Sequence, residues 1–313
     1  MAIPGPSAAP PRERASLRRL RGMWAIVWRL LAWFALWAVL AGACIVPVRV
    51  GLAGWVRAHA LRAQIWGDVT MALTLLLASW LMARFADRAG LAALGLSGRC
   101  AGRLAARGVL LGTAWIAASL ALARLAGCLS WQPVGHFVPL ALAGAIVSLA
   151  ANALCQQLLL NGYLLHVLRG RIGTVAALGL AAGLFTLLHA PAFRGAWLPV
   201  VNVFAAGLLF LLARLATGSV WLPLGMHAAW NVLLGPGLGL SVSGTDQLAR
   251  GWRVFAVHGP TLLAGGAFGL EGGAFVTLTT LLAAAIAAGA WRARRARDRT
   301  KAVPDTVGDS LRS

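Results

Sequence analysis

The chain has few charged residues for its length, and very few acidic ones. Charged residues make up 12% of its 313 positions, and only eight of them are Asp or Glu. A soluble domain uses about twice that charged fraction to cover its surface. Hydrophobic residues make up 60% of the chain. This composition excludes an ordinary soluble domain and predicts that much of the apolar surface faces lipid.

Cysteines are also scarce, and they are scattered along the chain. No two of them form a CxxC pair, whereas structural zinc sites cluster their ligands. We therefore interpret the four cysteines as small apolar side chains and expect no structural zinc. They are Cys44, Cys100, Cys128 and Cys155.

Basic residues, by contrast, are abundant. Lys and Arg total 28, only Lys301 is a lysine, and the formal net charge is +20. The arginines cluster at the ends of apolar runs, which is the pattern that the positive-inside rule describes. Contact with anionic lipid headgroups explains this placement, so we expect membrane lipids, and not nucleic acid, as partners.

Eight apolar runs predict an all-α fold, a polytopic membrane helix bundle with about eight transmembrane helices. The predicted spans are 23–46, 67–85, 106–127, 138–160, 173–190, 197–214, 219–234 and 274–291. The predicted regions are a disordered basic tail (1–22), three transmembrane helices (23–130), a helical core (138–291) and a basic cytoplasmic tail (292–313).

The distribution of basic residues predicts the orientation in the membrane. With the N-terminus in the cytoplasm, 20 of the 28 basic residues fall in cytoplasmic segments and 7 outside, while Arg29 lies within the first span. We expect a multi-pass protein of the bacterial cytoplasmic membrane with both termini in the cytoplasm. The long outside loop, 235–273, is rich in glycine and is either a connector or a cap over the bundle.

Polar side chains at membrane depth cost free energy unless they are paired, so each indicates a structural contact or a site. Three pairs stand four residues apart and share a helix face. The pairs are Gln157 with Asn161, Phe185 with His189, and His227 with Asn231. At about 1.5 Å per residue, Gln156, His189 and His227 come to a similar depth, which predicts one polar pocket.

Interhelical hydrogen bonding is the alternative to a functional site for such residues. For Asn152 and Asn202 we prefer this structural interpretation. For His227 with Asn231 we prefer a site, because two polar side chains share one face of a short apolar span.

The motifs resemble those of the CPBP family, which groups CAAX-processing proteases with abortive-infection-type proteins. That family has a Glu-Glu-x-x-x-Arg-Gly run, then Phe-x-x-x-His, then His-x-x-x-Asn. The second motif is Phe185 to His189 and the third is His227 to Asn231, and the two histidines are 38 positions apart. The resemblance covers about residues 138–285.

The first motif departs from the family. It reads Gln156-Gln157-Leu158-Leu159-Leu160-Asn161-Gly162, so amides replace both acids and an asparagine replaces the arginine. The resemblance implies that the catalytic positions are Gln156, Gln157, His189, His227 and Asn231. It implies that the supporting positions are Asn161, Gly162, Phe185, Trp230 and Glu271.

In the family the first glutamate is thought to activate water, and a glutamine can only position water by hydrogen bonding. The resemblance therefore implies a glutamic-type intramembrane endopeptidase for membrane-embedded or prenylated CAAX-type peptides, with impaired catalysis. The alternative is a dead pseudoprotease that binds a transmembrane or lipidated peptide as a binding, immunity or chaperone-like partner.

Two further chemical possibilities stay open. His189 could act as the base with His227 as the electrophile, because an imidazole titrates near neutrality. Zinc held by His189 and His227 would lack a third ligand, so we expect no cofactor. A small transporter with a polar site at the midplane ranks last, because the sequence has no internal repeat.

Overall fold

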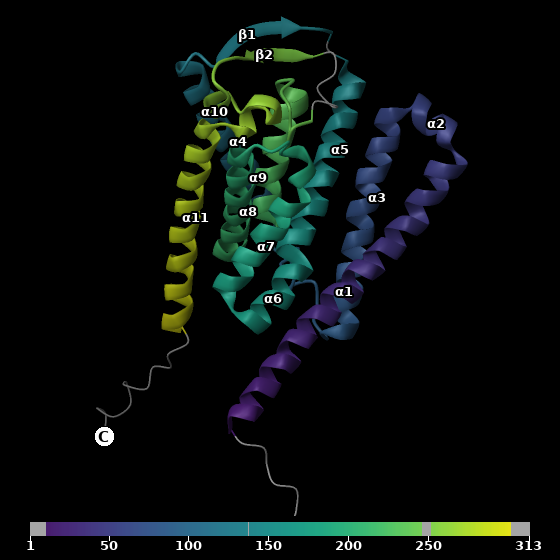
Figure 1. The fold of residues 1–313 in the computed structure, drawn as a ribbon, viewed down its shortest axis with the longest axis vertical. Helices are drawn as coiled ribbons and strands as arrows, with labels where there is room; N and C mark the ends of the chain where they lie inside the picture. Colours follow the sequence, from purple (N-terminus) through teal and green to yellow (C-terminus); the bar gives the residue numbers. More distant parts are fainter. Residues whose placement is uncertain (1–10, 137, 246–251, 302–313) are drawn as a thin grey trace, which may run out of the picture.

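The computed structural model describes residues 11–136, 138–245 and 252–301 of the chain, which form a bundle of helices (Figure 1). This architecture confirms the all-α membrane fold. The first helices are α1 (Pro11–Gly51), α2 (Ala53–Ala58), α3 (Ala60–Leu81), α4 (Ala101–Leu125) and α5 (Pro139–Leu158). The later ones are α6 (Leu164–Ile172), α7 (Thr174–Leu188), α8 (Trp197–Thr217), α9 (Trp221–Val232), α10 (Thr261–Ala264) and α11 (Ala274–Lys301).

Six helical segments of the described part are long and apolar enough to cross a membrane. They are Gly22–Gly51, Ala60–Ala86, Ala101–Leu125, Pro139–Ile172, Trp197–Thr217 and Ala274–Lys301. The other two predicted spans correspond to α7 and α9, which are shorter. The chain turns at Pro191 soon after α7, and Gly218, with φ +74°, ends α8 just before α9 begins.

The ends of the chain differ from the expected tails. The sequence predicted disorder for 1–22, but α1 begins at Pro11, and residues 1–10 lie outside the described part. Helix α11 likewise continues to Lys301, into the predicted tail 292–313. In both helices the apolar span extends into a basic segment with a glycine, Gly22 or Gly289, but no proline near the junction.

Helices α1 and α3 stand at one side of the bundle, where α1 packs on α3 and α3 packs on α5 (Figure 1). Helix α4 instead packs on α9, so the core includes a helix from outside the predicted 138–291. The contact requires glycine: a Cβ at Gly108 of α4 would overlap the carbonyl oxygen of Leu222, and one at Gly225 of α9 would overlap that of Ala105. Small residues at such a crossing let two helix backbones approach closely.

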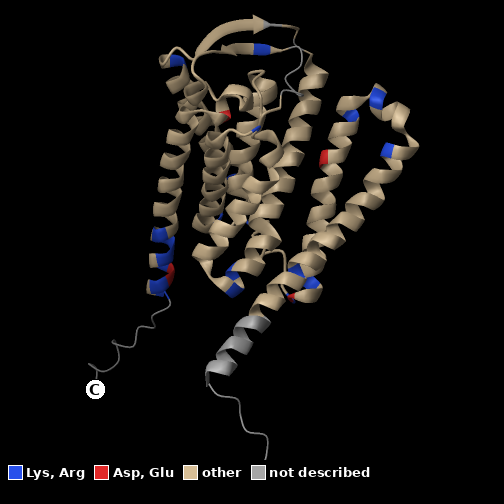
Figure 2. Cartoon of the chain, in the orientation of Figure 1, with Lys and Arg blue, Asp and Glu red and all other residues tan. Residues whose placement is uncertain are grey.

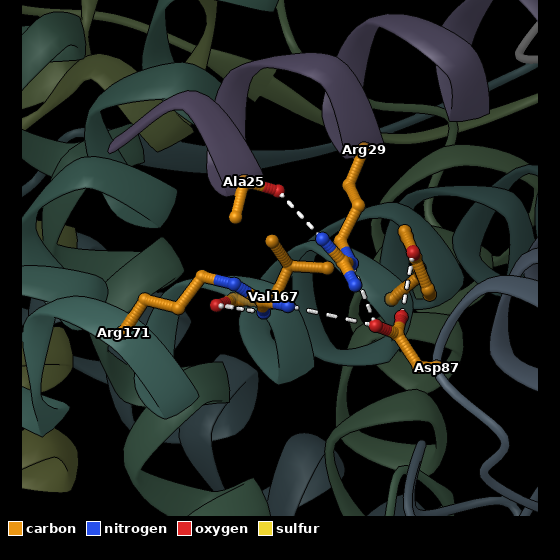
Figure 3. Close-up of polar contacts among 6 residues, drawn as sticks. Ala25, Arg29, Asp87, Val167 and Arg171 are labelled. Carbon is orange, nitrogen blue, oxygen red and sulfur yellow. Dashed lines mark hydrogen bonds and ion pairs between the residues drawn. The ribbon is translucent and has the colours of Figure 1, made fainter. Parts of the chain in front are cut away.

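Asp87 connects helix α1 to the core (Figure 3). Its carboxylate accepts hydrogen bonds from Arg29 Nε of α1 at 2.7 Å and from Tyr163 Oη at 2.7 Å, and it lies 3.5 Å from Arg171 of α6. Burial opposes ionisation of this carboxyl, but the bonds from Tyr163 and Arg29 outweigh burial and lower its pKa. Asp87 thereby neutralises arginines at the end of the bundle where α6 lies.

A small antiparallel sheet covers the opposite end of the bundle (Figure 1). It pairs β1 (Leu129–Val134) with β2 (Arg253–Val257). The rings of Trp131 and Phe255 pack across the pair with centroids 4.5 Å apart. Because β2 belongs to the long loop 235–273, the described part of that loop forms a cap over the bundle and not only a connector.

Candidate active site

The amides of the first motif extend in two directions from helix α5. Gln157 turns toward α9, where its Nε2 donates to His227 Nδ1 at 3.0 Å. Its Oε1 accepts a hydrogen bond from Asn161 Nδ2 at 2.6 Å. Since Nδ1 of His227 accepts, the ring proton sits on Nε2. Asn161, Gln157 and His227 therefore form a buried and uncharged hydrogen-bond chain.

A π-helical turn, Leu159–Tyr163, follows α5 and positions Asn161. Within the turn Gly162 has the non-helical angles φ −89° and ψ −117° and marks a kink between α5 and α6. Such turns are frequent at functional sites. The predicted fourth span, 138–160, thus continues past this kink as α6 to Ile172.

Aromatic rings hold the His227 imidazole in place. Phe210 of α8 stacks on it with ring centroids 4.8 Å apart, and Phe185 of α7 meets it edge-on at 6.3 Å. The Nδ1 atom of His189 donates to the carbonyl oxygen of Phe185 at 2.8 Å, which leaves Nε2 of His189 as an acceptor. The predicted pair Phe185 and His189 is therefore joined by a hydrogen bond as well as by spacing.

Gln156 turns the other way, toward α3. Its Nε2 donates to Asn152 Oδ1 at 2.7 Å, and Asn152 Nδ2 donates to Asp68 at 3.4 Å. Ser148 also donates to the Asp68 carboxylate. Asn152, interpreted from the sequence as structural, thus links Gln156 to a carboxylate. Gln156 Oε1 has no hydrogen-bond partner in the described part of the chain.

A cavity of about 400 Å³ lies beside these residues. It brings together three predicted catalytic residues, Gln156, His189 and Asn231, and the predicted supporting residue Phe185, with walls from α3, α5, α7 and the turns after α9. Among the described residues that line it, Asp68 is the only acid. This volume accommodates a short stretch of peptide side chains.

A smaller cavity of about 50 Å³ lies on the other side of His189 and Asn231, and His227 lines it. Glu271 also lines it and accepts hydrogen bonds from Trp230 Nε1 at 2.6 Å and from the Ser243 amide. The resemblance named Glu271 only as a supporting position, and the structure places it in the small cavity that His227 also lines, where it is bonded to Trp230.

The described residues contain no group of three His, Cys, Asp or Glu side chains arranged to hold a metal ion. His189 and His227 line the same small cavity but lack a third ligand. The absence of a cofactor stays a prediction.

Sequence reasoning missed two polar groups near this site. Asp68 belongs to α3, and its place in the large cavity follows from the packing of α3 on α5. Arg214 of α8 is buried and lines a further pocket together with Asn161. The only signal for both was a charged residue within or beside an apolar run.

Gln156, His189, His227 and Asn231 thus line two neighbouring cavities within the helix bundle. Residues 137–233 match the family model of the type II CAAX prenyl endopeptidase Rce1-like proteins. This match contains all three motif positions and supports the resemblance of this part of the chain to the CPBP-family intramembrane proteases. Neither a curated protein nor a solved structure matches the chain significantly.

Glu271 gives the protein a testable pH dependence. Burial raises the pKa of this carboxyl from 4.5 to about 7, although the Ser243 amide and Trp230 indole bonds lower it. A raised carboxyl pKa stabilises the fold at low pH, and that stability is lost as pH rises through about 7. We expect a loss of at most about 3 kcal/mol between pH 5 and pH 8.

The measurement is the melting temperature against pH in detergent for wild type and Glu271→Gln. The melting temperature of Glu271→Gln should fall much less than that of wild type between pH 5 and pH 8, because a neutral amide does not ionise. Asp298→Asn, at an exposed carboxylate of α11, is the matched control and should keep the wild-type slope. Equal slopes for wild type and Glu271→Gln would contradict this assignment.

Proposed function

We propose that the chain binds a membrane-embedded or prenylated CAAX-type peptide and hydrolyses it with strongly impaired chemistry. The observation that carries the proposal is the uncharged chain of Asn161, Gln157 and His227 beside a cavity of about 400 Å³. The cavity supports peptide binding. The amides at the positions of the family's glutamates support the impairment.

The roles of the individual groups follow from their chemistry. Asn231 and the Nε2 proton of His227 are donors that suit a developing oxyanion. Gln156 lines the large cavity and can orient a water there, but it cannot remove the proton of that water. Loss of a general base typically costs about 10²–10⁴ in rate.

Two groups are candidates for a residual base. His189 lines the cavity and keeps Nε2 free to accept a proton. Asp68 is a carboxylate in the same cavity, connected to Gln156 through Asn152. If neither acts, the protein is the alternative, a dead pseudoprotease that binds a peptide as an immunity or chaperone-like partner.

The proposal places the protein in the bacterial cytoplasmic membrane with both termini in the cytoplasm. Helix α1 begins and α11 ends at the same end of the bundle (Figure 1). Many of the described basic residues gather at that end (Figure 2). Both features support this orientation under the positive-inside rule.

The test uses the full chain in detergent with a prenylated, fluorescent CAAX-type peptide and measures binding and cleavage separately. We expect wild type to bind the peptide and to cleave it slowly. His227→Ala should abolish the residual cleavage, because the substitution removes the oxyanion donor. His258→Ala, in the cap, is the matched control and should behave as wild type.

The base is identified by two further variants in the same assay. Loss of cleavage in Asp68→Asn but not in His189→Gln assigns the base to Asp68, and the reverse pattern assigns it to His189. Binding without any cleavage by wild type would favour the pseudoprotease. Absence of binding by wild type and by every variant would reject the proposed function.

A further inference from the structure

A group of cationic side chains surrounds a pocket of about 300 Å³ at the end of the bundle where α6 lies. Arg169 and His166 of α6 and Arg214 of α8 line it, together with Asn161 and the first residue of α7, Thr174. No carboxylate of the described residues lines this pocket. It is separate from the two cavities that His189 and Asn231 share.

Arg214 is the unusual member of the group. It is 7% exposed, and its Nε atom has no hydrogen-bond partner in the described part of the chain. The described residues include no acid within 4.0 Å of its guanidinium. An unpaired buried charge is strongly unfavourable, and buried cations are normally paired.

The rest of this end of the bundle does not neutralise Arg214. Asp87 is bonded to Arg29 at 2.7 Å and lies 3.5 Å from Arg171, so this carboxylate is already used. The chain nevertheless makes room for the Arg214 side chain, because any Cβ at Gly95 would overlap the guanidinium. The site is thus shaped around a cation that lacks a counter-charge from the described residues.

The remaining lining groups indicate the chemistry of the missing partner. The Oδ1 atom of Asn161, a fully buried side chain, also has no hydrogen-bond partner in the described part of the chain. An acceptor beside two arginines suits an anion that also carries a hydroxyl. A water would satisfy both polar atoms, but it would leave the charge of Arg214 uncompensated.

We propose that this pocket binds a phosphate-type anion, with Arg214 as the central ligand, Arg169 as a second cation and His166 as a hydrogen-bond donor. Arginine pairs well with phosphate, and basic pockets between transmembrane helices bind lipid headgroups. The anion is either the phosphodiester of a membrane lipid or free inorganic phosphate. Asn161 is itself two hydrogen bonds from His227, so binding of the anion at Asn161 steadies the chain of Asn161, Gln157 and His227.

The test measures the melting temperature of the full chain in a neutral detergent. Inorganic phosphate is titrated against sodium chloride at equal ionic strength, and phosphatidylglycerol in the micelles is compared with phosphatidylcholine. We expect a rise of about 5 °C for wild type at an anion concentration on the order of 100 times Kd. A rise with phosphate indicates a free anion, and a rise with phosphatidylglycerol alone indicates a headgroup.

The variants assign the response to the pocket. Arg214→Gln should melt at or above anion-free wild type, because the unpaired charge is gone, and should lose the response. Should Arg214→Gln fail to fold, Arg169→Gln should weaken the response about tenfold. Arg299→Gln, in the exposed last turn of α11, is the matched control and should keep it. No response in wild type, or a full response in Arg214→Gln or Arg169→Gln, overturns the proposal.

Discussion

Restoring the family's charged motif is expected to raise peptide cleavage by about 10²–10⁴-fold over the wild-type chain. The variant is Gln156→Glu with Gln157→Glu and Asn161→Arg. Gln156 lines the large cavity, and its Oε1 has no partner in the described part of the chain. A carboxylate at position 156 would therefore face the cavity that we propose binds the substrate. A carboxylate accepts the proton from water that an amide leaves in place.

The third change is needed to keep the site folded once Gln157 is replaced by Glu. Gln157 is fully buried and is bonded to His227 and to Asn161. A carboxylate at position 157 alone would replace an amide donor with an acceptor and leave a charge unpaired. Because residue 161 already bonds residue 157 at 2.6 Å, an arginine there restores an ion pair within one helix turn.

The measurement is the initial rate of peptide cleavage at equal concentrations of folded protein. Adding His227→Ala to the restored variant is the control, and it should remove the gain, because a gain that arises at this site requires the His227 imidazole that contacts residue 157. A restored variant that folds, binds the peptide and still cleaves no faster than wild type would show that the site has lost more than its charge.

The sequence predicted some of the contacts among the candidate site residues and missed others. Spacing of four residues placed Gln157 beside Asn161, and the structure joins them by a hydrogen bond. Periodicity did not reveal that neighbouring Gln156 and Gln157 serve different partners. That split follows from the packing of α3 on one side of α5 and of α9 on the other.

The sequence motifs did not reveal the charged residues that helices distant in the sequence bring to the site. Asp68 lies 88 residues before Gln156, with which it lines the large cavity. Arg214 lies 53 residues after Asn161, with which it lines a further pocket. The position of each residue relative to the site follows only from the packing of its helix. The first motif itself carries no charge, but Arg214 brings a cation to the far side of Asn161. The neutral chain around His227 is therefore bordered by charge on both sides, with Asp68 beyond Gln156.

The contact between α4 and α9 fixes where His227 stands, and it depends on glycine. A Cβ at Gly108 or at Gly225 would overlap a backbone carbonyl oxygen of the opposite helix, and a Cβ at Gly112 would lie 2.5 Å from the oxygen of Met226. Backbone atoms cannot turn aside as a flexible side chain can. Any side chain at these positions must therefore push the helices apart.

We expect Gly108→Ala and Gly225→Ala each to destabilise the protein by about 1–3 kcal/mol, although alanine is the better helix former. The double variant should lose less stability than the sum of the losses in the two single variants, because the first substitution already separates the helices. Since α9 carries His227 and Asn231, the shift should also lengthen the 3.0 Å bond from Gln157 and abolish residual cleavage.

Melting temperature and peptide cleavage measured on the same preparations test this expectation. Gly102→Ala is the matched control on α4, because a Cβ there meets no atom within 4 Å and should be neutral or stabilising. If Gly108→Ala melts like Gly102→Ala, the two helices tolerate separation and their contact does not determine the site. If both properties fall together in Gly108→Ala and Gly225→Ala alone, the position of His227 depends on this glycine contact and not on the hydrogen bond from Gln157 by itself.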